Sequence, residues 1–341
     1  MEPTSLQIAW FLLIAVLIGA YAILDGFDLG VGILYLFRRN DRERRHSLNA
    51  IGPFWDGNEV WLVTGGAAIF AAFPPVYATA FSALYLALLA LLAGLITRAA
   101  AIEFRGKDAS ARWRSFWDWC FGLGSLVPAL LFGVAVGNVL RGIPIGRDGL
   151  YTGTFFGLLN PYALFIGSLS VVMFACHGAL YLALRSADEL RDRMLRWASR
   201  LWIAWVLGFG LATVLSAVVS PWLFDDFASR PQAWLTFAIL FAAFLGITLS
   251  ARVGKAGRAF ACSSVAIAAT LALAAFGIYP RMIPSLTDPR FSLTIANASA
   301  SQLTLKTMLI IAAIGMPIVI GYTIYIYRVF RGKTEIPEDG Y

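Results

Sequence analysis

The chain has 341 residues, of which 59% are hydrophobic and only 14% are charged, and its formal net charge is +7. A soluble domain of this size carries about a quarter charged residues, so the composition excludes an ordinary soluble protein. The basic residues lie in short segments between apolar runs, where membrane topology accounts for them, and this excludes a nucleic-acid-binding protein. The cysteines Cys120, Cys176 and Cys262 fall inside apolar runs without metal-ligand spacing, which predicts buried free thiols.

Apolar runs recur along the whole chain. A helix rising about 1.5 Å per residue needs about 20 apolar residues to cross the hydrocarbon core. The runs are continuous rather than alternating, which excludes strands, since lipid cannot satisfy open sheet edges. We therefore predict an all-α integral membrane protein that forms a single transmembrane domain over residues 1–341. The nine predicted spans cover approximately residues 6–37, 53–73, 76–104, 116–139, 161–185, 199–223, 232–252, 259–279 and 306–330.

A weak internal similarity suggests how these spans are grouped. Arg112-Trp113 precedes the fourth span and Arg196-Trp197 precedes the sixth, each followed by a serine and an aromatic, glycine-bearing helix. This pattern favours two four-helix bundles plus one peripheral helix.

Lysine and arginine are divided unequally between alternate connecting segments, which predicts the orientation. The six on one side are outnumbered by 20 on the other, in segments 38–45, 105–114, 185–200, 252–258 and 328–333. Positive residues accumulate in cytoplasmic loops. We therefore expect a multi-pass protein of the bacterial cytoplasmic (inner) membrane, with the N-terminus outside and the C-terminus in the cytoplasm.

Ionisable residues inside the first three predicted spans are the candidates for chemistry. Each such side chain costs a few kcal/mol to insert, so it calls for a reason. The first and third spans approach the basic side and the second leaves it, and we therefore expect the side chains to converge there. Two interpretations stay open: a path of water-linked carboxylates for protons, or interface anchors and helix caps. The six residues are Asp25, Asp28, Asp56, Glu59, Arg98 and Glu103.

The two histidines are weaker candidates for a cofactor site. His46 lies in a basic segment and His177 is alone in the fifth span, beside Cys176. A b-type haem needs axial ligands from facing helices, and one buried histidine cannot supply a bis-histidine site. The default interpretation of His177 is a hydrogen-bonded histidine of the helix bundle.

A set of motifs lies in order from the first span to the last, which makes the set specific. Its members are 25–32 (DGFDLGVG), 55–62 (WDGNEVWL), Arg98 with 103–105 (EFR), 137–138 (GN), 159–162 (LNPY) and 301–305 (SQLTL). Together these motifs resemble subunit II of the cytochrome bd family of quinol oxidases. Glu103 stands where other members have aspartate, and the Glu-Phe-Arg form is similar to the cyanide-insensitive branch.

This resemblance implies a heterodimer with subunit I, which carries haem b, haem d and the quinol site, while this chain binds no haem. The pair would oxidise quinol on the outer side and reduce oxygen to water with cytoplasmic protons, building membrane potential without proton pumping. A small single-span subunit, surrounding lipid and a quinone bound as a structural lipid are further partners that the resemblance allows.

The resemblance also assigns roles to individual residues. Asp25 and Asp56 become candidates for the proton path, with Arg98 and Glu103 in support, and Asp28 and Glu59 are weaker candidates. An oxygen route near Trp61 is implied by the family alone.

Two rival functions stay open at this point. An ion-coupled secondary transporter also uses intramembrane carboxylates, although transporters usually show broken spans in both halves of the chain. A purely structural subunit that supports subunit I would need no proton path.

Overall fold

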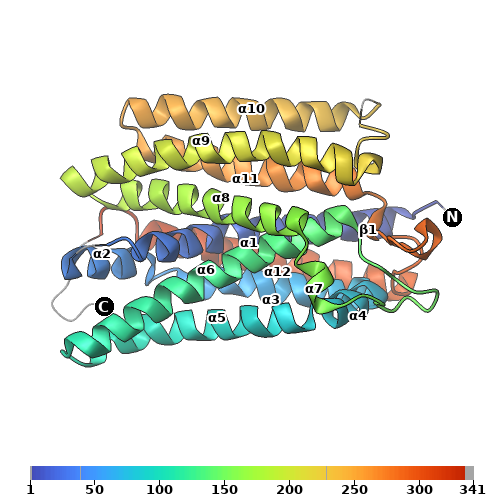
Figure 1. Ribbon diagram of the computed structural model, residues 1–341, viewed down its shortest axis with the longest axis horizontal. Coiled ribbons are helices and arrows are strands. Elements are labelled where there is room, and N and C mark those ends of the chain that lie inside the picture. Colours follow the sequence, from blue (N-terminus) through green and yellow to red (C-terminus); the bar gives the residue numbers. More distant parts are fainter. Residues whose placement is uncertain (1, 39, 228, 335–341) are drawn as a thin grey trace.

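The computed structural model describes residues 2–38, 40–227 and 229–334, and most of this chain is helical. The long helices lie side by side along one direction (Figure 1). The elements are α1 Ser5–Tyr35, α2 Asp41–Ile51, α3 Trp55–Ala72, α4 Pro74–Ala83, α5 Tyr85–Phe104, α6 Ala111–Arg141, α7 Phe155–Leu158, α8 Pro161–Arg185, α9 Asp188–Val219, α10 Pro231–Arg252, α11 Ala256–Ile278, β1 Arg281–Ile283, β2 Leu293–Thr294 and α12 Gln302–Val329.

Within the described chain, eight helices are long and apolar enough to cross a membrane: α1, α5, α6 and α8 to α12. The predicted span 53–73 corresponds to α3, which has only 18 residues and begins with acidic turns, and it is not among the eight. The predicted span 76–104 is divided between two helices, of which the second, α5, is among the eight. Pro74 starts α4 directly after Phe73, and the chain breaks again at Leu84 before α5.

Other helix ends also differ from the predicted ones. Helix α9 begins at Asp188 rather than near residue 199, and α6 begins at Ala111 rather than near 116. In both cases the helix begins with a polar, arginine-bearing segment ahead of its apolar part. A prediction from hydropathy finds only the apolar part. The basic segment after α1 forms α2, whose N-cap Asn40 accepts a hydrogen bond from the backbone of Glu43.

The two ends of the molecule differ in character. One end holds α2, the connections α5–α6, α8–α9 and α10–α11, and the C-terminal end of α12 (Figure 1). The described residues of all five basic segments lie at this end, which we call the basic end. The opposite end holds α4, α7 and a small antiparallel pairing of β1 with β2.

Helix α1 lies at the centre of the structure, packed against α3, α6, α8 and α11. Its second half is buried from Asp25 to Tyr35. Gly30 makes this burial possible, because a Cβ there would collide with the backbone of Phe174 on α8. Small residues let membrane helices approach closely in this way.

We predict that Gly30→Ala destabilises the protein by about 1–3 kcal/mol, because overpacking forces the two helices apart. Gly210→Ala on α9 is the matched control, since nothing lies within 4 Å of a Cβ built there. Thermal unfolding of the purified protein in detergent measures both variants. Equal midpoints for the two would contradict the close approach of α1 and α8.

Candidate functional site

Three helices bring an arginine and two acids together inside the bundle. Arg98 of α5 donates from Nη2 to Oδ1 of Asp25 on α1 and to Oε1 of Glu59 on α3, at 2.7 Å in each case. The side chains of Asp25 and Arg98 are fully buried, whereas that of Glu59 is 23% exposed. Arg98 therefore links a fully buried carboxyl group with one that is partly exposed at the surface of the chain.

Asp28 belongs to the same cluster but has a different partner. Its Oδ2 accepts a hydrogen bond of 2.7 Å from Asn58 Nδ2, and the whole residue is buried. The Asn58 amide also donates to the carbonyl of Leu24 at 3.1 Å and accepts from the hydroxyl of Tyr327 at 3.0 Å. No arginine or lysine among the described residues makes an ion pair with Asp28 in this structure.

The charges of this cluster do not balance. Asp25, Asp28 and Glu59 offer three acids against the single arginine Arg98. Uncompensated charge in a buried site is strongly unfavourable, so the acids are stabilised by binding protons or by water.

Polar atoms that face into the cluster point to water. Within the described residues, five buried atoms of the cluster lack a hydrogen-bond partner in the chain: Tyr21 Oη, Asp25 Oδ2, Asp28 Oδ1, Arg98 Nε and Arg98 Nη1. Buried polar groups are nearly always satisfied, and internal water is the usual partner when the protein supplies none. The arrangement is thus suited to hold protons and water in a chain.

The structure separates the six residues predicted to converge. Asp25, Asp28, Glu59 and Arg98 form the cluster. Asp56, in the first turn of α3, and Glu103, near the end of α5, are exposed instead. Trp61 is buried beside Leu17 and Tyr21, on the side of the cluster away from the basic end. Neither Asn58 nor Tyr327 was predicted as a site residue, because neutral side chains give no signal of misplaced charge.

His177 is held as a structural histidine. One ring nitrogen is 3.0 Å from the carbonyl of Ile23 and the other is 2.6 Å from the hydroxyl of Ser263. The ring stacks on Phe260, with centroids 4.6 Å apart. Both nitrogens are occupied, so ligation of a metal would require breaking one of these contacts.

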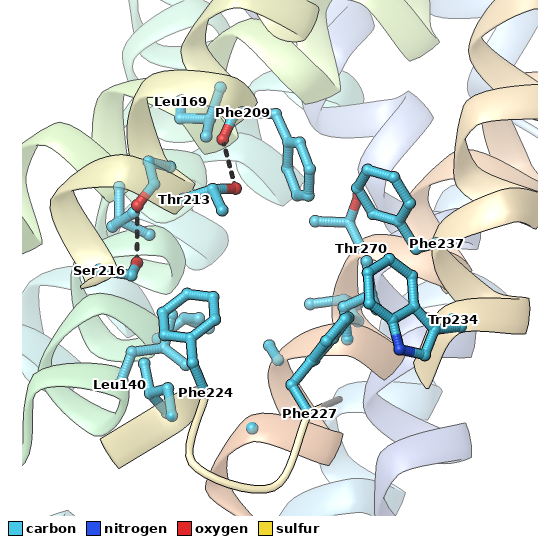
Figure 2. Close-up of a pocket in the computed structure, with 18 residues that line it drawn as sticks. Leu140, Leu169, Phe209, Thr213, Ser216, Phe224, Phe227, Trp234, Phe237 and Thr270 are labelled. Atoms are coloured by element: carbon cyan, nitrogen blue, oxygen red, sulfur yellow. Dashed lines mark hydrogen bonds between the residues drawn. The ribbon is translucent and has the colours of Figure 1, made fainter. Parts of the chain in front are cut away.

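A separate apolar cavity of about 330 Å³ lies between α6, α8, α9, α10 and α11. Two of its hydroxyls, on Thr213 and Ser216, donate to carbonyls of their own helix, whereas Thr270 Oγ1 is buried and lacks a partner among the described residues. Figure 2 shows aromatic side chains around the cavity: Phe209, Phe224, Phe227, Trp234 and Phe237.

Comparisons with known proteins identify the family. The family model described as cytochrome bd terminal oxidase subunit II matches residues 6–330. The chain belongs to this family. It is therefore a subunit of a terminal oxidase, and a multi-pass membrane protein.

Individual relatives agree along nearly the whole chain. The chain is 41% identical to cytochrome bd-I ubiquinol oxidase subunit 2 of Escherichia coli K12, over 96% of this chain and 95% of that protein. It is 36% identical to cytochrome bd ubiquinol oxidase subunit 2 of Bacillus subtilis, over 98% of each. A solved chain of the bd oxidase from Geobacillus thermodenitrificans shares the fold, with a TM-score of 0.75 at 18% identity over 96% of this chain and 99% of that one.

This subunit II has a second polar cluster, which sequence reasoning missed. Asp118 of α6 is buried and accepts hydrogen bonds from Tyr35, Arg44 and Arg105, the last at 2.6 Å. Arg105 also donates to Asp41 of α2 at 2.7 Å. The available signal was an acid between two tryptophans, 117–119, at the start of the fourth predicted span. The cluster fastens α2 to the ends of α5 and α6.

His46 of α2 is another buried polar group of the basic end. Its Nε2 lies 2.9 Å from the hydroxyl of Ser186. Burial, together with the nearby charges of Arg38 and Arg185, lowers the pKa of His46 to about 4. His46 is therefore neutral at physiological pH.

This value predicts how stability depends on pH. In the unfolded chain a histidine titrates near pH 6.5. Between about pH 6.5 and 4, His46 is therefore protonated in the unfolded state but neutral in the folded state. The free energy of unfolding falls as the pH is lowered through this window. We expect His46→Gln to flatten this part of the profile of unfolding midpoint against pH. Parallel profiles for the variant and the natural protein would show that His46 titrates normally.

Proposed function

We propose that this chain acts with subunit I of a cytochrome bd-type oxidase, which oxidises quinol and reduces oxygen to water, and that its acid cluster is the cytoplasmic entry path for the protons. The observation that carries the proposal is the bridge from Glu59 through Arg98 to the buried Asp25, surrounded by unpartnered polar atoms. Haem b and haem d, expected in subunit I, supply the redox chemistry. The proton uptake separates charge and contributes to membrane potential without pumping.

Exposure of the acids decreases in the order that such a path requires. Asp56 and Glu103 are exposed, Glu59 is partly buried, and Asp25 and Asp28 are fully buried. Asp56 and Glu59 are three residues apart and so share one face of α3. A proton collected at the surface by Asp56 or Glu103 reaches Glu59, and passes along the Arg98 side chain by way of water to Asp25.

Orientation follows from the basic end. Positive segments accumulate on the cytoplasmic side, so this end faces the cytoplasm, with the N-terminus outside. Helix α3 then serves as a ninth span, since 18 residues rise about 27 Å, close to the thickness of the hydrocarbon core. Helices α1, α3, α5 and α6 form one four-helix bundle, α8 to α11 form the other, and α12 is peripheral.

The remaining features of the family fit around this core. The exposed apolar surfaces of α9, α10 and α12 are left for lipid, subunit I and a small single-span subunit. Oxygen reaches the oxidase by the buried surroundings of Trp61. Family membership argues against an ion-coupled transporter. A purely structural subunit stays as the alternative, and the Asp25→Asn variant distinguishes it from a subunit with a proton path.

We predict that Asp25→Asn slows oxygen reduction by at least about tenfold, because the buried group can no longer exchange a proton. Turnover is measured with the complete complex purified from its membrane, and haem content is checked by optical spectrum. Asp226→Asn is the control, since Asp226 pairs with Arg230 in an exposed loop. Unchanged turnover in an assembled Asp25→Asn complex would indicate a purely structural subunit.

The apolar cavity is the place for a structural quinone. Its volume of about 330 Å³ lies at the small end of the range for ligand pockets, and it is lined by apolar side chains. Thr270 Oγ1 offers a hydroxyl without a partner, which suits a carbonyl oxygen. The described residues therefore fit a quinone ring.

We predict that Ala274→Phe, which fills part of this cavity, lowers the amount of quinone extracted per complex at least about fivefold, as expected for a clash in a packed site. Turnover should stay within about twofold, because the site is structural. Chromatography of an organic extract measures the quinone, and Thr236→Val on α10, which does not line the cavity, is the control. An unaltered quinone content would place any bound quinone elsewhere.

A further inference from the structure

Helix α12 has very little buried surface, yet one of its side chains reaches the acid cluster. Its most apolar window has no buried residue, and Leu305 is its one buried residue among those described. Tyr327, near its C-terminal end, donates from its hydroxyl to Oδ1 of Asn58 on α3. Because α12 packs so little, we expect this hydrogen bond to have a role in the buried site itself.

The link determines how the Asn58 amide is oriented. Because Oδ1 accepts from Tyr327, Nδ2 faces the other way and donates to Asp28 Oδ2 at 2.7 Å and to Leu24 O at 3.1 Å. Both amide hydrogens and the amide oxygen are therefore engaged. Rotation of the amide would place its oxygen against the Asp28 carboxyl group, which is repulsive.

The Tyr327 ring is held by packing that does not depend on its hydroxyl. It lies against Phe54, with centroids 4.6 Å apart, and edge-on to Phe27 at 6.5 Å. Removing the hydroxyl alone therefore leaves the ring in place.

Asp28 is sensitive to such a donor because of its surroundings. The charged groups that act on it are Asp25 on the same helix, Glu59 on α3 and Arg98 on α5. Two tyrosines also interact with it electrostatically: Tyr181 of α8, whose hydroxyl donates to the carbonyl of Ala50, and Tyr327 of α12, whose hydroxyl donates to Asn58. Two acids and one arginine leave a net negative environment, and Asn58 supplies the direct hydrogen bond to this carboxylate.

We propose that Tyr327 and Asn58 are positioning residues that orient Asp28 for proton transfer, Tyr327 acting through Asn58. This inference rests on the proposed proton path. Asp28 Oδ2 is held by Asn58, and its buried Oδ1 has no partner among the residues that the structure describes, so Oδ1 is the atom that gains and loses the proton. The position of α12 against α1 and α3 then governs how readily Asp28 exchanges that proton.

The test compares pH profiles of turnover for the assembled complex. Tyr327→Phe removes only the hydroxyl, and Asn58→Leu removes donor and acceptor at similar volume. Tyr162→Phe is the control, because it also deletes a buried tyrosine hydrogen bond, to Ser216 at 2.8 Å, far from the cluster. Haem content and the KM for quinol are measured alongside.

A carboxylate that loses a donor holds its proton more tightly. We expect Asn58→Leu to move the alkaline limb of the profile up by about one to two pH units, and Tyr327→Phe by about half a unit to one unit. The double variant should move it no further than Asn58→Leu alone, because coupled residues are non-additive. KM for quinol and the haem spectrum should stay unchanged, and Tyr162→Phe should behave as the natural complex.

The outcomes distinguish a failure of the positioning role from a failure of the proposed proton path. If Asp25→Asn slows turnover but Tyr327→Phe leaves the profile in place, the positioning role is wrong and the proton path stands. Fully additive shifts in the double variant would show that Tyr327 does not act through Asn58. If Asp25→Asn has no effect either, the proton path itself falls. Should Asn58→Leu fail to assemble, the Tyr327→Phe profile decides alone.

Discussion

The ion pairs of Arg98 are the constraint on which the site depends. A fully buried guanidinium needs partners for its charge, and Asp25 and Glu59 provide them from two other helices. Breaking such a pair leaves an uncompensated buried charge, which costs several kcal/mol. The pairs therefore fix the positions of α1, α3 and α5 relative to one another. They also bring a buried acid and a partly exposed acid to the same guanidinium group.

The close packing of α1 against its neighbours keeps the acids of the cluster away from lipid. Because Gly30 lets α1 lie directly against α8, the acids of α1 are surrounded by protein rather than lipid. Lipid could satisfy neither the carboxylates nor the unpartnered atoms beside them. The same packing leaves α12 at the margin, joined to the cluster by the Tyr327 hydroxyl.

The two polar clusters of the protein have different characters. Around Asp118, three donors surround one carboxylate, and Arg44 and Arg105 balance the charges of Asp118 and Asp41, as in a structural fastening of α2. Around Arg98 three acids exceed one cation, and five buried polar atoms have no partner among the described residues, against one, Arg44 Nε, in the Asp118 cluster. The excess of acids around Arg98 is the property on which the proposed proton path rests, and the charge-balanced cluster around Asp118 does not share it.

Hydropathy and misplaced charge are local properties of the chain, so the amino-acid sequence is enough to predict the membrane class, most spans and four members of the cluster. It could not reveal that 76–104 breaks into α4 and α5, since the residues around Leu84 are as apolar as those of a continuous helix. Nor could it identify Asn58 and Tyr327, which lie 269 residues apart and acquire their role only by meeting at Asp28. Such long-range hydrogen bonds are decided by how helices pack, and the tertiary structure alone supplies that information.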